Sequence, residues 1–133
     1  MRASGSFTVK LAPQAIPGIP ADPLMGQMSL DKTFSGDLTG TGSGSMITGG
    51  DYRTGSAAYS AIEHVQGTLN GKTGGFLLQH TGTMHQGAHS LTITVVPASG
   101  VGELVGITGT MTIAIDNGAH LYDLDYELPP SAP

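Results

Sequence analysis

Apolar and polar residues alternate along most of the chain, which is the pattern of β-strands that bury one face. Residues 6–11 read SFTVKL and place Phe7, Val9 and Leu11 on one face, and residues 28–38 alternate in the same way. No segment shows the 3.6-residue periodicity of an amphipathic helix. The pattern predicts about eight strands, which with their turns cover residues 6–11, 28–38, 40–50, 57–71, 74–87, 90–96, 107–118 and 119–128.

Proline and glycine mark the connections between these strands. Four prolines in residues 13–23 would interrupt a ladder of backbone hydrogen bonds, so residues 12–27 are predicted to form a Pro-rich loop. Pro97 ends one strand, and the ASGVGELVG that follows is predicted to be a loop or a short helical turn. We expect a single domain over residues 1–128 and a flexible tail over residues 129–133.

Three short turns allow the register of neighbouring strands to be worked out. Asn-Gly pairs favour two-residue hairpin turns, because both central residues of such a turn adopt positive φ. Counting outward from turns at residues 70–71, 86–87 and 117–118 places the apolar residues of both strands on the same face, as a correct register requires. The predicted partners are Tyr59–Gly82, Ala61–His80, Glu63–Leu78, Val65–Phe76, Gly82–Leu91, His80–Ile93, Ile113–Tyr122, Met111–Leu124 and Gly109–Tyr126.

Glycines on the inward-facing set favour a closed barrel over a two-layer sandwich. Gly36, Gly67, Gly82 and Gly109 lie on the apolar face, where the absence of a side chain suits the sharp bends of a small barrel. Most connections are also short enough for a meander. We therefore predict an all-β fold, a closed antiparallel up-and-down barrel of about eight strands.

Composition and charge narrow the classes of partner. The chain of 133 residues suits one domain, and its formal net charge of −5 argues against nucleic acid or an anionic membrane as a partner. No stretch approaches the ~20 apolar residues of a membrane span. The chain has no cysteine and its first residues lack an apolar signal core, so we expect a cytoplasmic protein. No motif indicates a cofactor.

Four stretches of the chain are distinctive: SLDKTFSGDLTGTGSGSM, YSAIEHVQGTLNGKTGGFLLQHTGTMHQG, LTITVVPASGVGELVGITGTMTI and YDLDYEL. Together they resemble an uncharacterised bacterial family, a domain-of-unknown-function group whose barrel is similar to that of allene oxide cyclase. The resemblance covers nearly the whole chain apart from the Pro-rich loop and the tail. It implies an eight-stranded antiparallel barrel with a central cavity, and it implies no activity.

Glu63 and His80 are the candidate catalytic residues, because both fall on the inward-facing set of adjacent strands. The register places them directly or diagonally opposite, with Cβ atoms roughly 5–8 Å apart. Burial disfavours the charged form of each group, whereas their mutual attraction favours it. Such a pair could move protons near neutral pH, or it could be a structural pair that holds the register.

Further inward-facing residues are candidates for ligand contacts. Lys32 lies between two apolar inward positions, and we interpret it as an amine that reaches out near a barrel mouth, although a central position would make it the counter-ion of Glu63. Inward tyrosines are usually core residues whose hydroxyl finds a partner. The candidate ligand-binding residues are Lys32, Tyr59, Phe76, Leu78, Met84, Tyr122 and Tyr126.

The remaining motifs do not indicate a metal or nucleotide site. His85 and His89 flank a turn, while His64 and His120 lie elsewhere, so no spacing gathers about three metal ligands and we interpret these side chains as solvated. GTLNGKT and GTGSGS resemble phosphate-binding and dinucleotide-binding loops, but both belong to hairpins and neither opens a helix.

The residues leave three interpretations open. The first is a barrel that binds one small apolar or amphipathic molecule, with Glu63 and His80 giving it orientation. The second is an isomerase or cyclase-type enzyme that folds a reactive substrate in the cavity and uses the same pair. The third is a structural barrel with a filled interior, which acts through its surface or as a homodimer. The Pro-rich loop, which carries Ile16 and Ile19, could cap an opening.

Overall fold

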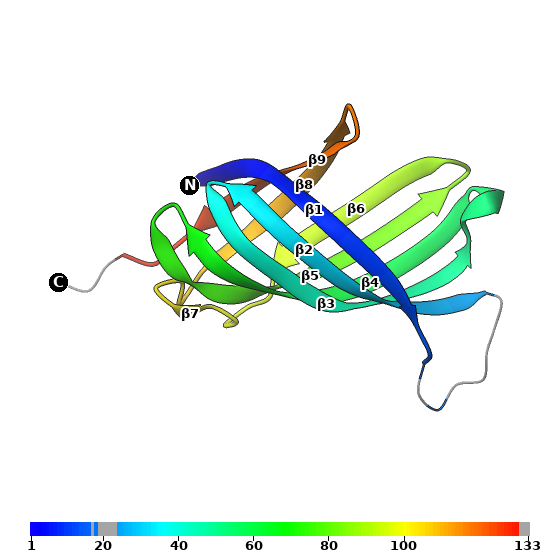
Figure 1. Ribbon diagram of the computed structural model, residues 1–133, viewed down its shortest axis with the longest axis horizontal. Coiled ribbons are helices and arrows are strands. Elements are labelled where there is room, and N and C mark those ends of the chain that lie inside the picture. Colours follow the sequence, from blue (N-terminus) through cyan, green and yellow to red (C-terminus); the bar gives the residue numbers. More distant parts are fainter. Residues whose placement is uncertain (17, 19–23, 131–133) are drawn as a thin grey trace.

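The computed structural model describes residues 1–16, 18 and 24–130, with the side chain of Tyr52 excepted. Within these residues the chain forms β-strands, one short 3-10 turn and no α-helix (Figure 1). In this described part of the chain, no helix is long and apolar enough to cross a membrane. The elements are β1 (Arg2–Gln14), β2 (Met25–Gly36), β3 (Leu38–Asp51), η1 (Tyr52–Thr54), β4 (Ser56–Leu69), β5 (Lys72–His85), β6 (Ala88–Val95), β7 (Val101–Gly102), β8 (Thr108–Asp116) and β9 (Ala119–Glu127).

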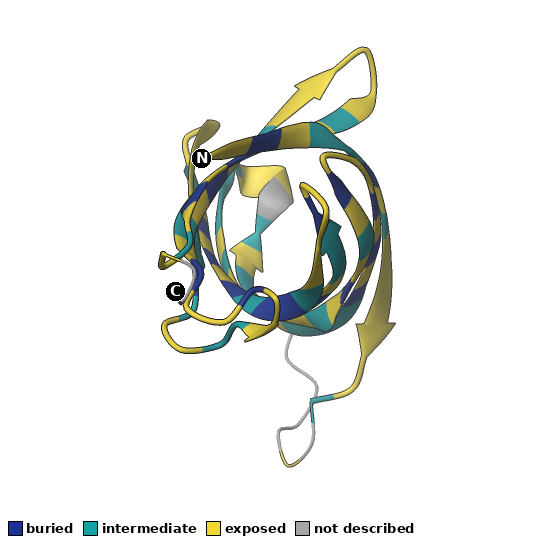
Figure 2. Cartoon of the chain, turned by 90° about the vertical axis from the view of Figure 1, so that its left-hand side faces the viewer, coloured by how far each residue is buried: buried dark blue, intermediate teal, exposed yellow. Residues whose placement is uncertain are grey.

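The strands close into a barrel. Their order is β4-β3-β2-β1-β9-β8-β6-β5, every pairing is antiparallel, and a further pairing between β4 and β5 joins the two ends. The short strand β7 pairs with Gly74 and Gly75 of β5, just before the residues of β5 that pair with β6. Figure 2 looks along the barrel from the end where β1 begins and shows the ring as closed. The prediction of a closed antiparallel barrel of about eight strands is confirmed, with β7 as one extra strand.

The predicted hairpin registers are confirmed. The first hairpin pairs Glu63 with Leu78 and Ala61 with His80. The second pairs His80 with Ile93, and the last pairs Met111 with Leu124. All three turns contain a non-glycine residue at positive φ, namely Asn70 at 46°, Gln86 at 51° and Asn117 at 50°. Two-residue turns therefore set the pairing of these strands, as the counting assumed.

The predicted loop over residues 12–27 is too long. β1 continues to Gln14 and β2 begins at Met25, with Pro13 opposite Met28. Pro13 is tolerated because β1 pairs with β9 only as far as Phe7 among the described residues, so this part of β1 has a free edge. Ile16 is partly buried, and Ile19 lies outside the described residues.

Two other segments are predicted to be irregular, the one after Pro97 and the C-terminal tail. The segment after Pro97 contains β7 and turns, without a helical turn. Of the predicted tail over residues 129–133, residues 131–133 lie outside the described residues.

The apolar core fills one end of the barrel. Phe76 and Leu78 of β5 are fully buried there with Leu69 of β4. Residues 96–107 pack along β5 at this end, where the backbone N–H of Val96 donates to Leu77 and that of Glu103 donates to Thr73. Leu104 and Ile107 from this segment are each 1% exposed and join the same core cluster. We call this the closed end.

Candidate functional site

Three polar side chains meet inside the barrel. Lys32 comes from β2, Glu63 from β4 and His80 from β5, and all three are buried. Glu63 Oε1 accepts a hydrogen bond from Lys32 Nζ at 3.1 Å and lies 2.8 Å from His80 Nε2. We refer to these three residues as the polar cluster. Its centre is the carboxylate, which is 0% exposed.

A glycine makes room for this carboxylate. Strand β3 lies between β2 and β4, so the Glu63 side chain must cross β3 to reach Lys32. Gly42 is the residue of β3 that pairs with Lys32, and a Cβ atom at this position would collide with Glu63 Oε2. The ion pair between β2 and β4 therefore depends on the absence of a side chain at this position of β3.

The surroundings keep Glu63 ionised. Burial raises the pKa of its carboxyl group, but the hydrogen bond from His80 and the positive charge of Lys32 outweigh this, so the pKa lies below its usual value. An ionised carboxylate only accepts hydrogen bonds, so His80 Nε2 carries the proton in this contact. Glu63 Oε2 is buried and has no hydrogen-bond partner among the described residues.

Lys32 is held by aromatic rings as well as by the carboxylate. Its Nζ lies 4.6 Å from the centroid of the Phe7 ring and 5.7 Å from that of Phe34. At these distances the negative face of each ring attracts the ammonium group. The amine is therefore positioned on the inner wall and does not extend to bulk solvent.

A cavity of about 290 Å³ lies against the polar cluster. Lys32 and His80 form part of its wall, whereas Glu63 is not among the lining residues. The rest of the wall is mostly apolar. The lining residues are Phe7, Val9, Leu11, Leu30, Lys32, Met46, Tyr59, Ala61, His80, Leu91, Ile113 and His120. We call this space the inner cavity.

A second cavity of about 580 Å³ continues from the first towards the β5–β6 turn. It shares Tyr59, Leu91 and Ile113 with the inner cavity. The lining residues are Ala57, Tyr59, Gly82, Thr83, Met84, His89, Ser90, Leu91, Ile113 and Ile115. We call this space the outer cavity, and the barrel end that contains both cavities the open end.

The outer cavity lies where two strands separate. Among the described residues, β6 pairs with β8 only at Ile93–Met111 and Thr94–Thr110. Beyond these pairs the β8–β9 hairpin diverges from β6 (Figure 1). Leu91 and Ile115, from the separated parts of the two strands, are 42% and 69% exposed. The barrel wall is therefore continuous at the closed end and split at the open end.

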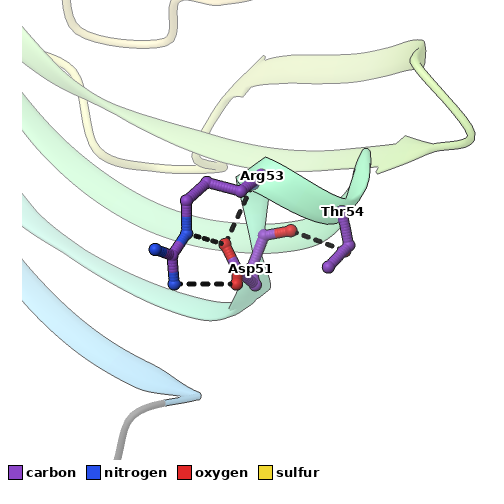
Figure 3. Close-up of polar contacts among 3 residues, drawn as sticks. All are labelled: Asp51, Arg53 and Thr54. Atoms are coloured by element: carbon purple, nitrogen blue, oxygen red, sulfur yellow. Dashed lines mark hydrogen bonds and ion pairs between the residues drawn. The ribbon is translucent and has the colours of Figure 1, made fainter.

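A polar turn forms part of the rim at the open end, between β3 and β4 (Figure 3). The Asp51 carboxylate accepts hydrogen bonds from the backbone N–H and the guanidinium of Arg53, and Thr54 Oγ1 donates to the Asp51 carbonyl. The Arg53 contacts hold the pKa of the Asp51 carboxyl below its usual value. A hydrogen bond from the Gly87 N–H to the Gly55 carbonyl joins this turn to the β5–β6 turn.

Sequence comparison places the chain in a family. Residues 3–126 match a family described as a protein of unknown function, DUF3224. The chain belongs to the DUF3224 family. A crystal structure of a DUF3224 protein of unknown function from Shewanella oneidensis MR-1 is 42% identical, covers 98% of each chain and has a TM-score of 0.90. No curated protein matches the chain. The resemblance to an uncharacterised bacterial family is thus confirmed, while the likeness to allene oxide cyclase stays a prediction.

Within this DUF3224 barrel, Glu63 and His80 lie inside the lumen as the register predicted, and they touch. Their catalytic role stays a prediction. The interpretation of Lys32 as an amine that reaches out of the barrel mouth is wrong, since its side chain is 4% exposed and bonded to Glu63. The alternative, that Lys32 is the counter-ion of Glu63, holds. Periodicity indicates the face of a residue but not its depth along the barrel axis.

The other candidate ligand contacts also differ in their depth along the barrel axis. Tyr59 and Met84 line the cavities. Phe76 and Leu78 lie in the packed closed end and line neither cavity.

Tyr122 and Tyr126 belong to the same packed cluster and use their hydroxyl groups structurally. The Tyr122 hydroxyl accepts from the Leu38 N–H and lies 2.9 Å from the Ser35 carbonyl, and the Tyr126 hydroxyl accepts from Asn70. These two tyrosines, like Phe76 and Leu78, line neither the inner nor the outer cavity.

His120 is the wall residue that the sequence interpretation missed. It is only partly exposed, its ring centroid lies 5.2 Å from that of Phe7, and it lines the inner cavity. His120 is on the same face of β9 as Tyr122 and Leu124, so the register of the last hairpin already turns it inward. Its pairing with Phe7 joins the first and last strands of the barrel. The described residues contain no group of three or more side chains placed to hold a metal ion.

Proposed function

We propose that this DUF3224 barrel binds one small molecule with an apolar body in its inner cavity, with the polar end of that molecule against Lys32 and His80. The observation that carries the proposal is the inner cavity itself. Its apolar wall contains two hydrogen-bonding groups side by side, which is the usual make-up of a small-molecule site. The outer cavity provides a route to it and additional room for the ligand.

The polar cluster supports the proposal because stability alone does not account for it. Burying an ion pair costs several kcal/mol, and well-packed apolar residues of similar size often stabilise a protein as much or more. Glu63 retains a buried oxygen without a partner, which adds to this cost. Perturbed ionisable groups beside a cavity are typical of functional sites.

The structure favours binding over the two alternatives. Glu63 does not line the inner cavity, so a substrate there would touch His80 but not the carboxylate that a cyclase-type mechanism would use. A filled interior describes the closed end, whereas the open end has two cavities. A cytoplasmic location and a homodimer stay predictions, and the net charge of −5 supports a partner other than nucleic acid.

A neutral fluorescent probe tests the proposal. N-phenyl-1-naphthylamine brightens in apolar surroundings, and we expect it to bind the wild-type protein with one site per chain. Ala61→Phe places a ring in the inner cavity and should weaken binding at least tenfold. Ser60→Phe is the matched control, because Ser60 is the neighbouring residue of β4 and is exposed on the outer face. Absence of binding to the wild type, or equal binding by both folded variants, would overturn the proposal.

A further inference from the structure

The charges around the inner cavity are arranged asymmetrically. Its wall carries Lys32, His80 and His120, and no acidic residue is among the lining residues. The one acidic partner, Glu63, lies behind the wall and is 0% exposed. A ligand in the cavity therefore meets the cationic or cation-forming side chains and is separated from the carboxylate by them.

The hydrogen bond to Glu63 determines what His80 offers to a ligand. Because Nε2 donates to an ionised carboxylate, the neutral ring has its second nitrogen, Nδ1, as an acceptor. A ligand carboxylate placed against that lone pair would be repelled. If His80 takes up a proton, Nδ1 becomes a donor and the same contact becomes a charge-assisted hydrogen bond.

The charge balance leads to the same conclusion. The charges of Lys32 and Glu63 cancel, so with the neutral form of His80 the polar cluster carries no net charge. A ligand with one negative charge would leave one uncompensated charge in an apolar cavity, which costs several kcal/mol. One additional proton on His80 restores neutrality. A ligand with two negative charges, such as a phosphate monoester, would remain unbalanced.

No other ionisable group on the surrounding strands replaces His80 in this role. Tyr59 of β4 and His120 of β9 face the inner cavity, but Lys32 and His80 are the only ionisable partners of Glu63 among the residues that the structure describes. The neighbouring strand β6 contributes apolar residues, Leu91 and Ile93, opposite β5, and β3 contributes Gly42, Gly44 and Met46 next to β2 and β4. His89 of β6 lines only the outer cavity.

We propose that the ligand is a monocarboxylic acid with an apolar body, that its carboxylate binds between Lys32 and His80, and that His80 takes up one proton on binding. This inference rests on the proposed function, since it names the chemical class of the molecule in the inner cavity. It assigns Lys32 as the fixed positive charge and His80 as the group that adjusts to the ligand.

Octanoate and 1-octanol are a matched pair of probes, because they differ in the charged head group. Calorimetric titration in two buffers with different ionisation enthalpies, between about pH 5.5 and about pH 8, measures the protons taken up. At the upper pH, octanoate binding should be accompanied by the uptake of about one proton by the protein, and the affinity should fall by up to about tenfold per pH unit. The affinity of 1-octanol should not change with pH.

Two variants locate the proton. In His80→Gln, octanoate should bind without proton uptake and at least tenfold more weakly at the lower pH, while 1-octanol still binds independently of pH. In His64→Gln, which changes an exposed histidine on the outer face of β4, proton uptake should persist. Proton uptake that persists in His80→Gln would mean that His120 or the acid itself takes up the proton, and it would overturn the inference.

The inference and the proposed function fail in different ways. If the naphthylamine probe binds in the inner cavity but octanoate does not displace it, the barrel binds small molecules and the carboxylate assignment is wrong. If octanoate binds with no proton uptake at any pH, the role of His80 is wrong. If the naphthylamine probe itself does not bind to the wild type, the proposed function has failed.

Discussion

The two ends of the barrel share the strands β4 and β5 but differ in how closely the inward-facing residues pack. At the closed end these two strands contribute Val65, Leu69, Phe76 and Leu78, all buried in one core cluster. At the open end they contribute Ala57, Tyr59, Ala61 and Gly82, which border the cavities. The same backbone pairing therefore supports a packed core in one half and a cavity in the other.

Strand pairing is also more complete at the closed end than at the open end. β8 pairs with β9 along its whole length, Thr108–Asp116, but with β6 only at Thr110 and Met111. The polar cluster lies at the boundary between the packed and the hollow half, with Leu78 opposite Glu63 on one side and Ala61 opposite His80 on the other. The closed end supplies apolar burial, which leaves the open end free to carry charged groups and a cavity.

The comparison predicts its largest effect at the closed end. Phe76→Ala removes a ring that is 0% exposed, and it should lower the free energy of unfolding by about 3–5 kcal/mol in urea denaturation. Leu91→Ala at the open end should lower it by only about 1 kcal/mol or less, because Leu91 is 42% exposed. Similar losses for the two variants would contradict the division into a packed and a hollow end.

The next largest effect on stability is expected at the polar cluster, between the packed and the hollow half of the barrel. Glu63→Gln leaves the Lys32 ammonium buried without a counter-ion, and it should cost about 3 kcal/mol of unfolding free energy. Adding Lys32→Met removes that charge at similar volume, so the double variant should recover at least half of the loss. A double variant no more stable than Glu63→Gln would show that the two residues are not energetically coupled.

A smaller effect on stability tests the room that Gly42 of β3 leaves for the Glu63 carboxylate. Gly42→Ala places a methyl group where Glu63 Oε2 lies, and it should cost about 1–3 kcal/mol by displacing the carboxylate. Gly49→Ala is the matched control on the same strand, because the nearest atom to its Cβ would be the Leu24 carbonyl oxygen at 3.9 Å. We expect Gly49→Ala to leave stability unchanged or raise it slightly. Equal losses would mean that Gly42 has a general backbone role.

The smallest expected effect is on the pH dependence of stability. Folding lowers the pKa of Glu63, so its contribution to stability is present above the pKa of an unfolded glutamate and is lost as the pH falls through the lower folded value. Urea midpoints of the wild type should therefore fall on acidification, and those of Glu63→Gln should fall less steeply. Asp51 also has a lowered pKa, but it is present in both proteins and cancels in the comparison. Parallel pH dependences would contradict an ionised Glu63.

Much of the fold follows from the amino-acid sequence, because it depends on local relations. Alternation of apolar residues determines the strands, and turns of two residues determine the partners on both sides of each hairpin. These two rules are enough to place Glu63 and His80 on the inner face of adjacent strands. The family resemblance rests on the sequence too, since it is carried by residues 3–126.

Only the tertiary structure decides which half of the barrel is hollow and which side chains meet there. Lys32 reaches Glu63 across β3, and His120 comes next to Phe7 through the pairing of the first strand with the last. The separation of β6 from β8 likewise depends on how the ring closes. These relations are non-local: depth along the barrel axis is set by the stagger of all strands together, and no single hairpin carries that information.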